Sequence, residues 1–542
     1  MKSVVLVSTV LVSVSVFAAK TPAGIEIPDR PQKVVEFQLE SGEGLYGASA
    51  VFGRKVPFGL EMKSCDYDLR RHSYGNHTAP VLISNHGRYV WCEEGFDFKV
   101  DNGKVTLSSN EKDFRIGKSG TTLRDAFKFV SKNFLPPSGK TPDLLFVAAP
   151  QWNTWIELGY NQNQKDVLAY AHKIVDSGFP AGVMMIDDTW QRDYGVWRFD
   201  NAAFPDPKAM CDELHKLGFR VILWTCPFVS MDSAEYRHLA EKGALLKDGW
   251  GRPAAITWWD GVSAVLNFDV PYAKEWYKGE LDKLVNAYGI DGFKFDAGDT
   301  GYYDTADQRL KFVGYEQEGD LNRHNRNWSL FATQYRFNEM RASWKCGGQP
   351  LVQRLCDKGC DFGAVQQLVP DMINTGLMGN NFVCPDMIGG GDLGTYLNSK
   401  LDQECFVRSA QVHALCPMMQ FSAAPWRVLD AEHFGAIKKA VEIRQKFAPR
   451  FVELAKECAV SGEPMLRSME YQFPGNGYEL VKDQFVMGDF LIVAPQVEKG
   501  AKERKVLIPA GEWTGDDGKS YVGPATVSVA TPLDRIPHFV RK

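Results

Sequence analysis

The sequence predicts an α/β protein in which a (β/α)8 TIM barrel is flanked by an N-terminal β-sandwich and a smaller C-terminal β-sandwich domain. Short apolar runs alternate with helical patterns over about 300 residues, which is typical of parallel β/α units. Polar side chains follow several of these runs, as they do at the carboxyl ends of barrel strands. A doubly wound sheet would place a Gly-rich phosphate loop after its first strand, but the first strand here ends in "APQWNTW". These observations favour the barrel.

Residues 1–19 predict a secretory signal peptide. Lys2 supplies the positive start, residues 4–17 form an apolar run with interspersed Ser and Thr, and Ala18 and Ala19 suit cleavage. The run is short for a transmembrane helix, and no later run reaches ~18 uninterrupted apolar residues. We therefore expect an exported protein, periplasmic or secreted, with no membrane span in the mature chain; an uncleaved anchor is the alternative.

Residues 20–140 predict the N-terminal β-sandwich domain. Short alternating segments are broken by Gly, Asn and Asp, and Asn102-Gly103 stands between two of them, which is a strong hairpin signal. The stretch "FLPPSGKTPD" (residues 134–143) has the composition of a linker.

Residues 141–455 predict the catalytic barrel. Helical spacing of apolar residues occurs at 167–175, and helices are also expected at 206–218 and 271–288. After about Val460 the helical patterns stop, and residues 456–542 predict the C-terminal β domain. The apolar runs that predict barrel strands are 144–150, 181–188, 220–228, 289–298, 350–357 and 381–390.

Composition excludes several functions. The formal net charge is −5 and Lys and Arg are not clustered, which does not fit nucleic-acid binding. Neither paired CxxC motifs nor HExxH occurs, so we expect no metal and no cofactor. If the 11 cysteines form disulfides, at least one thiol remains unpaired. The sequence does not indicate an oligomeric state.

The stretch "GFKFDAGD" carries the chemistry most clearly. Alternation along a strand places Lys294 and Asp296 on one face, and the ammonium group should keep the carboxyl group ionised. An ionised carboxylate at a sugar pocket can attack an oxocarbenium-like centre. Three alternatives remain: a structural ion pair, a Schiff-base lyase that uses Lys294, and a non-catalytic sugar-binding barrel.

A glycosidase needs a second carboxyl group, and the candidates are Asp357, Asp361 and Asp386. In "MMIDDTWQ", the adjacent Asp187 and Asp188 end a predicted strand and could bind sugar hydroxyl groups, a hard cation or the following turn. Aromatic rings pack on sugar faces as well as in cores. The tryptophans considered for sugar stacking are Trp152, Trp155, Trp190, Trp224 and Trp258.

Together these residues resemble glycoside hydrolase family 31. "GIDGFKFDAGD" is similar to the nucleophile strand of that family, and "WRFDNAAFPDPKAM" resembles its "F-x-x-D…FPDP" segment. "CPDMIGGGDLG" resembles its "HDIGG" segment, and "DQFVMGDFLIVAPQVEKGAKERKVLIPAGEW" its C-terminal β domain. The resemblance covers nearly all of the expected mature chain, in the right order.

The resemblance implies a retaining α-glycosidase that acts on a carbohydrate. Asp296 falls on the nucleophile. The acid/base of the family lies in a "W-x-G-D-N-x-x-x-W" segment, and the corresponding stretch here, "VQRLCDKGCDF", departs from that pattern. Asp357 falls on the acid/base, with Asp361 as the fallback. Asp386 falls on a sugar-binding His. Lys294 and Arg354 are expected to bind hydroxyl groups and to keep the nucleophile ionised.

The resemblance also bears on the sugar. "IDDTW" and "KFD" resemble segments of α-galactosidases, and the compact layout resembles a family branch that contains one. Asp187 or Asp188 would accept a hydrogen bond from an axial 4-hydroxyl group. We expect an exo-acting α-galactosidase, with an α-glucosidase or another α-glycosidase of the family as the alternative.

Overall fold

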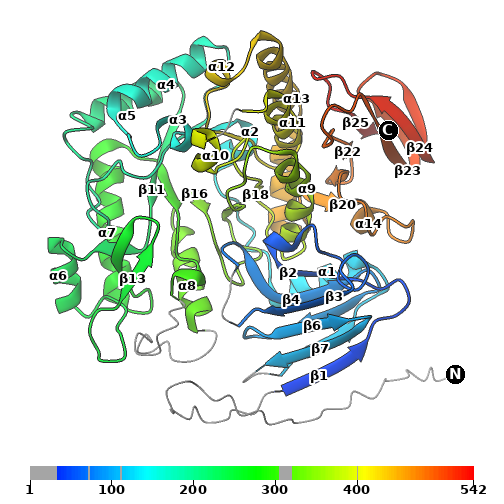
Figure 1. Ribbon diagram of the computed structural model, residues 1–542, viewed down its shortest axis with the longest axis horizontal. Coiled ribbons are helices and arrows are strands. Elements are labelled where there is room, and N and C mark those ends of the chain that lie inside the picture. The colour runs from blue at the N-terminus through cyan, green and yellow to red at the C-terminus, as the bar shows by residue number, and fades with distance from the viewer. Residues whose placement is uncertain (1–32, 71–73, 110–112, 304–319, 399–400) are drawn as a thin grey trace.

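The structure, a computed structural model, describes residues 33–70, 74–109, 113–303, 320–398 and 401–542. The expected signal peptide, residues 1–19, lies outside the described residues. Figure 1 shows the N-terminal sheets in blue, the barrel in cyan to yellow and the C-terminal strands in red. None of the described helices is long and apolar enough to cross a membrane. All 11 cysteines are free thiols in the structure.

The N-terminal part contains two four-stranded antiparallel sheets, as predicted. Asn102 and Gly103 both have positive φ and join two paired strands, which confirms the hairpin. One helix, α1 (Leu123–Phe134), was not expected; it packs on β4 and β5 and begins with a capping box between Thr122 and Asp125. The sheet orders are β1 (Lys33–Gln38), β7 (Lys104–Ser109), β6 (Asp97–Asp101), β3 (Ser64–Asp68), and β2 (Leu45–Ser49), β4 (Thr78–Ser84), β5 (Arg88–Trp91), β8 (Arg115–Lys118).

Eight parallel strands form the barrel. From the first strand to the seventh they are paired in chain order, and the eighth pairs with the first; no pairing between the seventh and the eighth is found among the described residues, so the barrel is nearly closed. The strands are β9 (Gln151–Asn153), β10 (Val183–Ile186), β11 (Arg220–Thr225), β15 (Gly292–Phe295), β16 (Phe337–Met340), β17 (Val352–Arg354), β18 (Val383–Cys384) and β19 (Gln420–Phe421). An antiparallel sheet of β12 (Phe228–Ser230), β14 (Gly261–Val265) and β13 (Ala255–Trp258) is inserted after β11.

Helices surround these strands, and three expected helices appear as α4, α5 and α7. The expected strand at 144–150 is wrong: residues Leu145–Ala148 form the helical turn α2, because Asp143 accepts a hydrogen bond from the amide of Leu145. The helices are α3 (Trp155–Leu158), α4 (Gln164–Asp176), α5 (Pro207–Lys216), α6 (Ala234–Glu241), α7 (Pro271–Tyr288), α8 (Asp320–Ala332), α9 (Phe362–Gly376), α10 (Leu393–Asn398), α11 (Gln403–Ala414), α12 (Pro425–Val428) and α13 (Ala431–Ser461). Short 3-10 turns are η1 (Ala50–Phe52) and η2 (Thr300–Tyr302).

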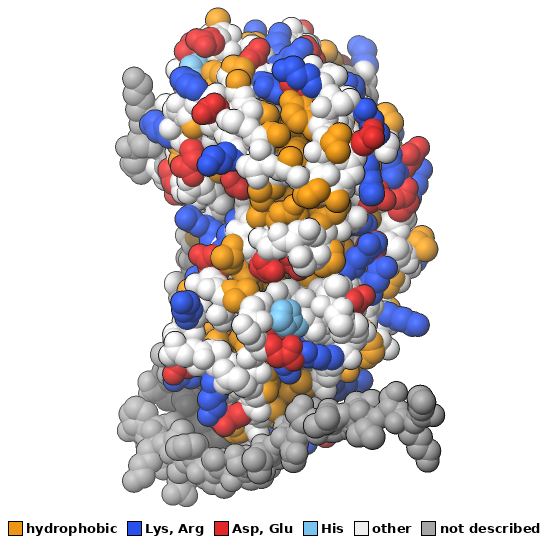
Figure 2. Space-filling model, turned by 90° about the vertical axis from the view of Figure 1, so that its right-hand side faces the viewer, with side chains coloured by type: hydrophobic (Ala, Val, Ile, Leu, Met, Phe, Trp, Pro, Cys, Tyr) orange, Lys and Arg blue, Asp and Glu red, His pale blue; other side chains and the backbone are white. Residues whose placement is uncertain are grey.

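The C-terminal β-sandwich is built on a six-stranded antiparallel sheet, beside helix α13 (Figure 1). Its strand order is β20 (Leu466–Ser468), β21 (Phe485–Met487), β22 (Leu491–Val493), β25 (His538–Arg541), β23 (Glu503–Gly515) and β24 (Ser520–Ala530), with the one-turn helix α14 (Met469–Gln472) after β20. On the face drawn in Figure 2, acidic and basic side chains are interspersed, so this face carries no continuous basic patch.

Register across the barrel positions the site. Trp224 on β11 is opposite Lys294 on β15, which is opposite Glu339 on β16. Because the strands are parallel, their carboxyl ends meet at one edge of the barrel, where TIM-barrel enzymes carry their active sites.

Candidate active site

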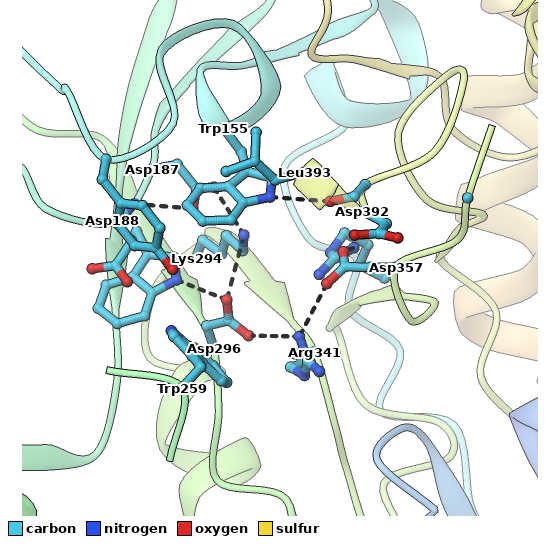
Figure 3. A pocket seen from close by; sticks show the side chains of 15 residues that line it. Trp155, Asp187, Asp188, Trp259, Lys294, Asp296, Arg341, Asp357, Asp392 and Leu393 are labelled. Atoms are coloured by element: carbon cyan, nitrogen blue, oxygen red, sulfur yellow. Dashed lines mark hydrogen bonds and ion pairs between the residues drawn. The ribbon is translucent and has the colours of Figure 1, made fainter. Parts of the chain in front are cut away.

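A cavity of about 380 Å³ lies at this end of the barrel. Seven of the nine predicted site residues line it: Asp187, Asp188, Trp224, Lys294, Asp296, Arg354 and Asp357. Figure 3 shows these side chains converging from several strands, with Lys294 and Arg341 between the carboxylates. The volume falls within the ~300–1,000 Å³ range of small-molecule sites.

Asp296 is an ionised carboxylate at the end of β15. Trp224 Nε1 donates a hydrogen bond of 2.7 Å to its Oδ2, and Lys294 Nζ lies 3.5 Å from the same oxygen. Burial raises the pKa of Asp296, but Lys294 and then Arg341 more than offset this and hold it well below its ordinary value. The predicted pairing of Lys294 with Asp296 is therefore confirmed.

Lys294 is buried between two acids. Its Nζ donates a 2.8 Å hydrogen bond to Asp187, opposite its contact with Asp296. Burial lowers the pKa of Lys294, but the charges of Asp187 and Asp296 outweigh burial and raise it. Because a Schiff base requires a neutral amine, this environment disfavours the lyase alternative.

Arg341, which the sequence reasoning missed, connects the two proposed catalytic acids. It follows β16, and its Nη1 lies 3.6 Å from Asp296 Oδ1 and 3.4 Å from Asp357 Oδ2. Because both oxygens contact the same nitrogen, they lie within about 7 Å of each other. Asp299, which does not line the cavity, lies 3.6 Å from Nε of the same guanidinium group and has a role in holding it.

Asp357 follows β17 and enters the cavity from the side opposite Asp188 (Figure 3). One third of its side chain is exposed, and Arg354 Nη1 donates a 2.6 Å hydrogen bond to its Oδ1. Burial raises the pKa of Asp357, but Arg354 and Arg341 outweigh burial and lower it, while Asp296 opposes them. The fallback Asp361 is the N-cap of α9, where its Oδ1 accepts from Ala364, so its role is structural.

Asp386 does not line the cavity, which corrects the expectation of a direct sugar contact. Its side chain is fully buried behind the loop that carries Asp357, and its Oδ1 accepts a 3.0 Å hydrogen bond from Arg354. The glycines beside it allow close packing: a Cβ on Gly390 would lie 2.2 Å from the carbonyl oxygen of Lys358.

Asp187 and Asp188 both line the cavity, as predicted. Tyr194 donates a 2.6 Å hydrogen bond to Asp260, a residue of the β13–β14 turn, and its hydroxyl oxygen lies 3.3 Å from Asp188. Burial, followed by the hydrogen bond to Asp260, raises the pKa of Asp188 well above its ordinary value. Asp188 therefore shares Tyr194 with Asp260, whereas Asp187 is paired with Lys294.

Of the predicted tryptophans, Trp224 and Trp155 line the cavity. Trp190 does not: its indole is fully buried, donates to the carbonyl of Trp224 and so supports that strand rather than a sugar. Trp259, which was not predicted, lines the cavity with 39% of its surface exposed. Trp152 and Trp258 belong to the aromatic core.

Three non-glycine residues with positive φ surround the site: Thr189 at 72°, Ala297 at 53° and Asp386 at 122°. Two of them follow an active-site acid and donate their amide to it, since Thr189 bonds Asp188 and Ala297 bonds Asp296. Such backbone conformations cost about 1–3 kcal/mol and concentrate at functional sites.

One group of possible metal ligands, Glu40, Glu43 and His86, occurs among the described residues. Its carboxylates are already neutralised, because Arg88 lies 2.8 Å from Glu43 and Lys118 lies 2.5 Å from Glu40. This group is an ion-pair network far along the chain from the barrel residues, and its chemistry does not favour a metal.

Comparison with known proteins identifies the family. The family description "Glycosyl hydrolases family 31 TIM-barrel domain" matches residues 149–454, and "Glycosyl hydrolase family 31 C-terminal domain" matches residues 462–542. The myogenesis-regulating glycosidase of Mus musculus is 31% identical over 428 residues, which cover 77% of this chain and 59% of the mouse protein.

Two further relatives differ in their named substrates. Alpha-glucosidase 2 of Bacillus thermoamyloliquefaciens is 24% identical over 431 residues, or 72% of this chain and 52% of that protein. The crystal structure of an alpha-xylosidase from a soil metagenome, complexed with xylose, has a TM-score of 0.81 at 21% identity and covers 97% of this chain and 81% of that one; it shows the fold alone. The two curated relatives are both much longer than the region this chain matches. By the match over its barrel and its C-terminal domain, the chain belongs to glycoside hydrolase family 31.

Proposed function

We propose that the protein is a retaining, exo-acting α-glycoside hydrolase that releases a terminal sugar from an oligosaccharide or glycoconjugate. The observation that carries this proposal is the placement of Asp296 and Asp357 in one cavity, on either side of Arg341. Asp296 is kept ionised, and Asp357 is the more exposed of the two, as a group that meets the leaving oxygen and water should be. A non-catalytic barrel would not need both.

The two carboxyl groups have complementary roles. Asp357 gives its proton to the glycosidic oxygen as the bond from C1 to that oxygen breaks and Asp296 bonds to C1. The charge of Asp296 raises the pKa of Asp357, so its loss in the glycosyl-enzyme lowers that pKa and turns Asp357 into a base. Asp357 then takes a proton from water, which attacks C1 and releases Asp296.

For the sugar, we propose a terminal α-galactoside. Asp187 and Asp188 both line the cavity, and their carboxyl oxygens can accept hydrogen bonds from sugar hydroxyl groups, which suits recognition of an axial hydroxyl group. The second candidate is an α-glucoside or α-xyloside, and the names of the bacterial and metagenomic relatives favour it.

A panel of 4-nitrophenyl α-glycosides tests both parts. The wild type is expected to cleave one α-glycoside best, the galactoside on the primary proposal. Asp296→Asn and Asp357→Asn should each lose about 10²–10⁴-fold in kcat/KM. Asp361→Asn is the matched control and should stay within about threefold, because Asn also caps helices well. Full activity of either catalytic variant would refute the assignment, and preference for glucoside or xyloside would refute only the choice of sugar.

We also propose that the protein is exported after removal of residues 1–19, on the strength of the apolar run and the two alanines. N-terminal sequencing of the protein from its native host should begin at Lys20. A cytoplasmic protein that retains Met1 would contradict this.

A further inference from the structure

The carboxylate of Asp386 forms hydrogen bonds with the loop that carries Asp357 and with residues next to that loop. Its Oδ2 accepts from the amide of Lys358 at 2.8 Å and from the amide of Gly391 at 3.1 Å, while its Oδ1 accepts from Arg354 at 3.0 Å. We propose that Asp386 is a positioning residue for Asp357: it fixes the loop that carries the acid/base and shares the charge of Arg354 with it. This inference rests on the proposed function of Asp357.

The geometric part follows from the backbone contacts. Lys358 directly follows Asp357. A hydrogen bond from the amide of Lys358 to Asp386 therefore fixes the peptide unit between Asp357 and Lys358. Gly391 closes the other side: a Cβ there would lie 2.5 Å from Asp357 Oδ1 and 2.8 Å from Asp386 Oδ1. The two carboxyl groups are thus held against one glycine, without room for a sugar between them.

The electrostatic part follows from Arg354. Its side chain is 1% exposed, and the same Nη1 contacts Asp357 at 2.6 Å and Asp386 at 3.0 Å. Arg354 and Arg341 together lower the pKa of Asp357, which works against an acid catalyst, and Arg354 also lies 3.6 Å from Glu339. The second carboxylate takes up part of the charge and raises the proton affinity of the first, because two neighbouring carboxyl groups disfavour each other's ionised form.

The backbone conformation and the burial of Asp386 also indicate a functional role for this residue. Asp386 has φ of 122°, a conformation that strains any residue other than glycine, and it buries a carboxyl group completely. Burial and the charge of Asp357 raise the pKa of Asp386 to about 6, so near neutral pH it is largely ionised and can serve as the second anion. A residue that only filled space would need neither feature.

The test uses Asp386→Asn and Arg354→Gln in the full-length enzyme, with substrates of poor and good leaving groups. Asparagine keeps an acceptor for the loop amides but removes the charge, so the basic limb of kcat/KM should move about one pH unit lower. Arg354→Gln removes the shared cation, so the limb should move in the opposite direction. Asp371→Asn is the matched control: Asp371 is equally buried but contacts Lys358 Nζ, at 3.6 Å, instead of Arg354.

Leaving groups separate positioning of an acid from a general structural effect. In Asp386→Asn, a methyl or sugar leaving group should lose about tenfold more kcat/KM at pH 7 than 2,4-dinitrophenyl, which needs little protonation. The inference would be overturned by equal losses of kcat/KM for both leaving groups or by an unshifted basic limb. An effect on KM alone would also overturn it, because it would show a direct sugar contact. The same shift in Asp371→Asn would also overturn it.

A readout without turnover keeps the inference separate from the proposed function. In protein labelled with 13C at the Asp carboxyl carbons, the signal lost in Asp357→Asn reports the titration of Asp357. Its pKa should be lower in Asp386→Asn than in the wild type and higher in Arg354→Gln. A wild type that cleaves no α-glycoside would refute the proposed function, and an unchanged titration would refute the coupling.

Discussion

Replacement of Lys294 by methionine removes the cation that keeps the nucleophile ionised while it keeps most of the side-chain volume. Lys294 Nζ lies 3.5 Å from Asp296 and 2.8 Å from Asp187, and 3% of the side chain is exposed. At an effective dielectric constant of about 20, the attraction across 3.5 Å is about 5 kcal/mol, which corresponds to an upper bound of about 3.5 pKa units. Arg341 remains, so we expect the pKa of Asp296 to rise by about two units.

The assay is the pH dependence of kcat/KM, which reports the free enzyme. Because Asp296 must be ionised to attack, activity falls as pH drops through its pKa, and in the wild type this acidic limb lies below ~3.9. In Lys294→Met the limb should move up to or above ~3.9. Lys358→Met is the matched control, since Lys358 is a buried lysine that contacts Asp371 instead; its acidic limb should stay in place.

The same substitution should also lower the free energy of unfolding. A depressed carboxylate pKa stabilises the fold above the unfolded value of ~3.9, and this contribution is lost as pH falls through the folded value. Lys294→Met leaves the buried Asp187 without its cation and Asp296 with Arg341 alone, so urea denaturation at pH 7 should show a loss of about 3–5 kcal/mol, and the loss should shrink in acid. A folded variant whose acidic limb and stability match those of the wild type would refute the electrostatic role of Lys294.

Three further substitutions have defined outcomes. Gly391→Ala places a Cβ 2.5 Å from the acid/base carboxylate and should lower kcat at least about tenfold. Gly435→Ala, where a Cβ would meet no atom within 4 Å, should leave activity unchanged. Equal activities of the two variants would contradict the close packing at Gly391. Trp259→Ala should raise KM for disaccharides about three- to tenfold through lost stacking, and Trp250→Ala, on an exposed turn, should not; an unchanged KM in the first would exclude a sugar contact. Arg444→Met frees three buried carbonyl oxygens and should destabilise the fold by about 3 kcal/mol in urea denaturation with KM unchanged, so a neutral effect would show that water replaces it.

Sequence patterns predicted the parts of the site that lie on regular, apolar strands. The alternation in "GFKFDAGD" placed Lys294 and Asp296 together, and the run before Asp187 and Asp188 ended where a parallel strand ends. The Asn102-Gly103 hairpin was predicted because both residues tolerate positive φ. These signals are local, and burial of the whole strand makes them strong.

The missed residues lie where local signals are weak. Strand β16 reads "FNEM", and its buried Glu339 bonds Gln420 inside the barrel, so the strand does not look apolar and Arg341 after it was overlooked. Trp259 lies on the turn between β13 and β14, where the hairpin signal Asp260-Gly261 marks its position. The position of Asp386 behind Arg354 depends on tertiary packing, which a family resemblance does not fix.

The central claim is that Asp296 forms a covalent bond to the sugar. Incubation with a 5-fluoro-α-glycosyl fluoride of the preferred sugar should slow release of the intermediate, because fluorine destabilises the oxocarbenium-like transition state. Proteolysis and tandem mass spectrometry should then find one sugar on the peptide that contains "DGFKFDAGD", attached at Asp296. A sugar on any other residue, or hydrolysis of the fluoride without a covalent adduct, would contradict the account.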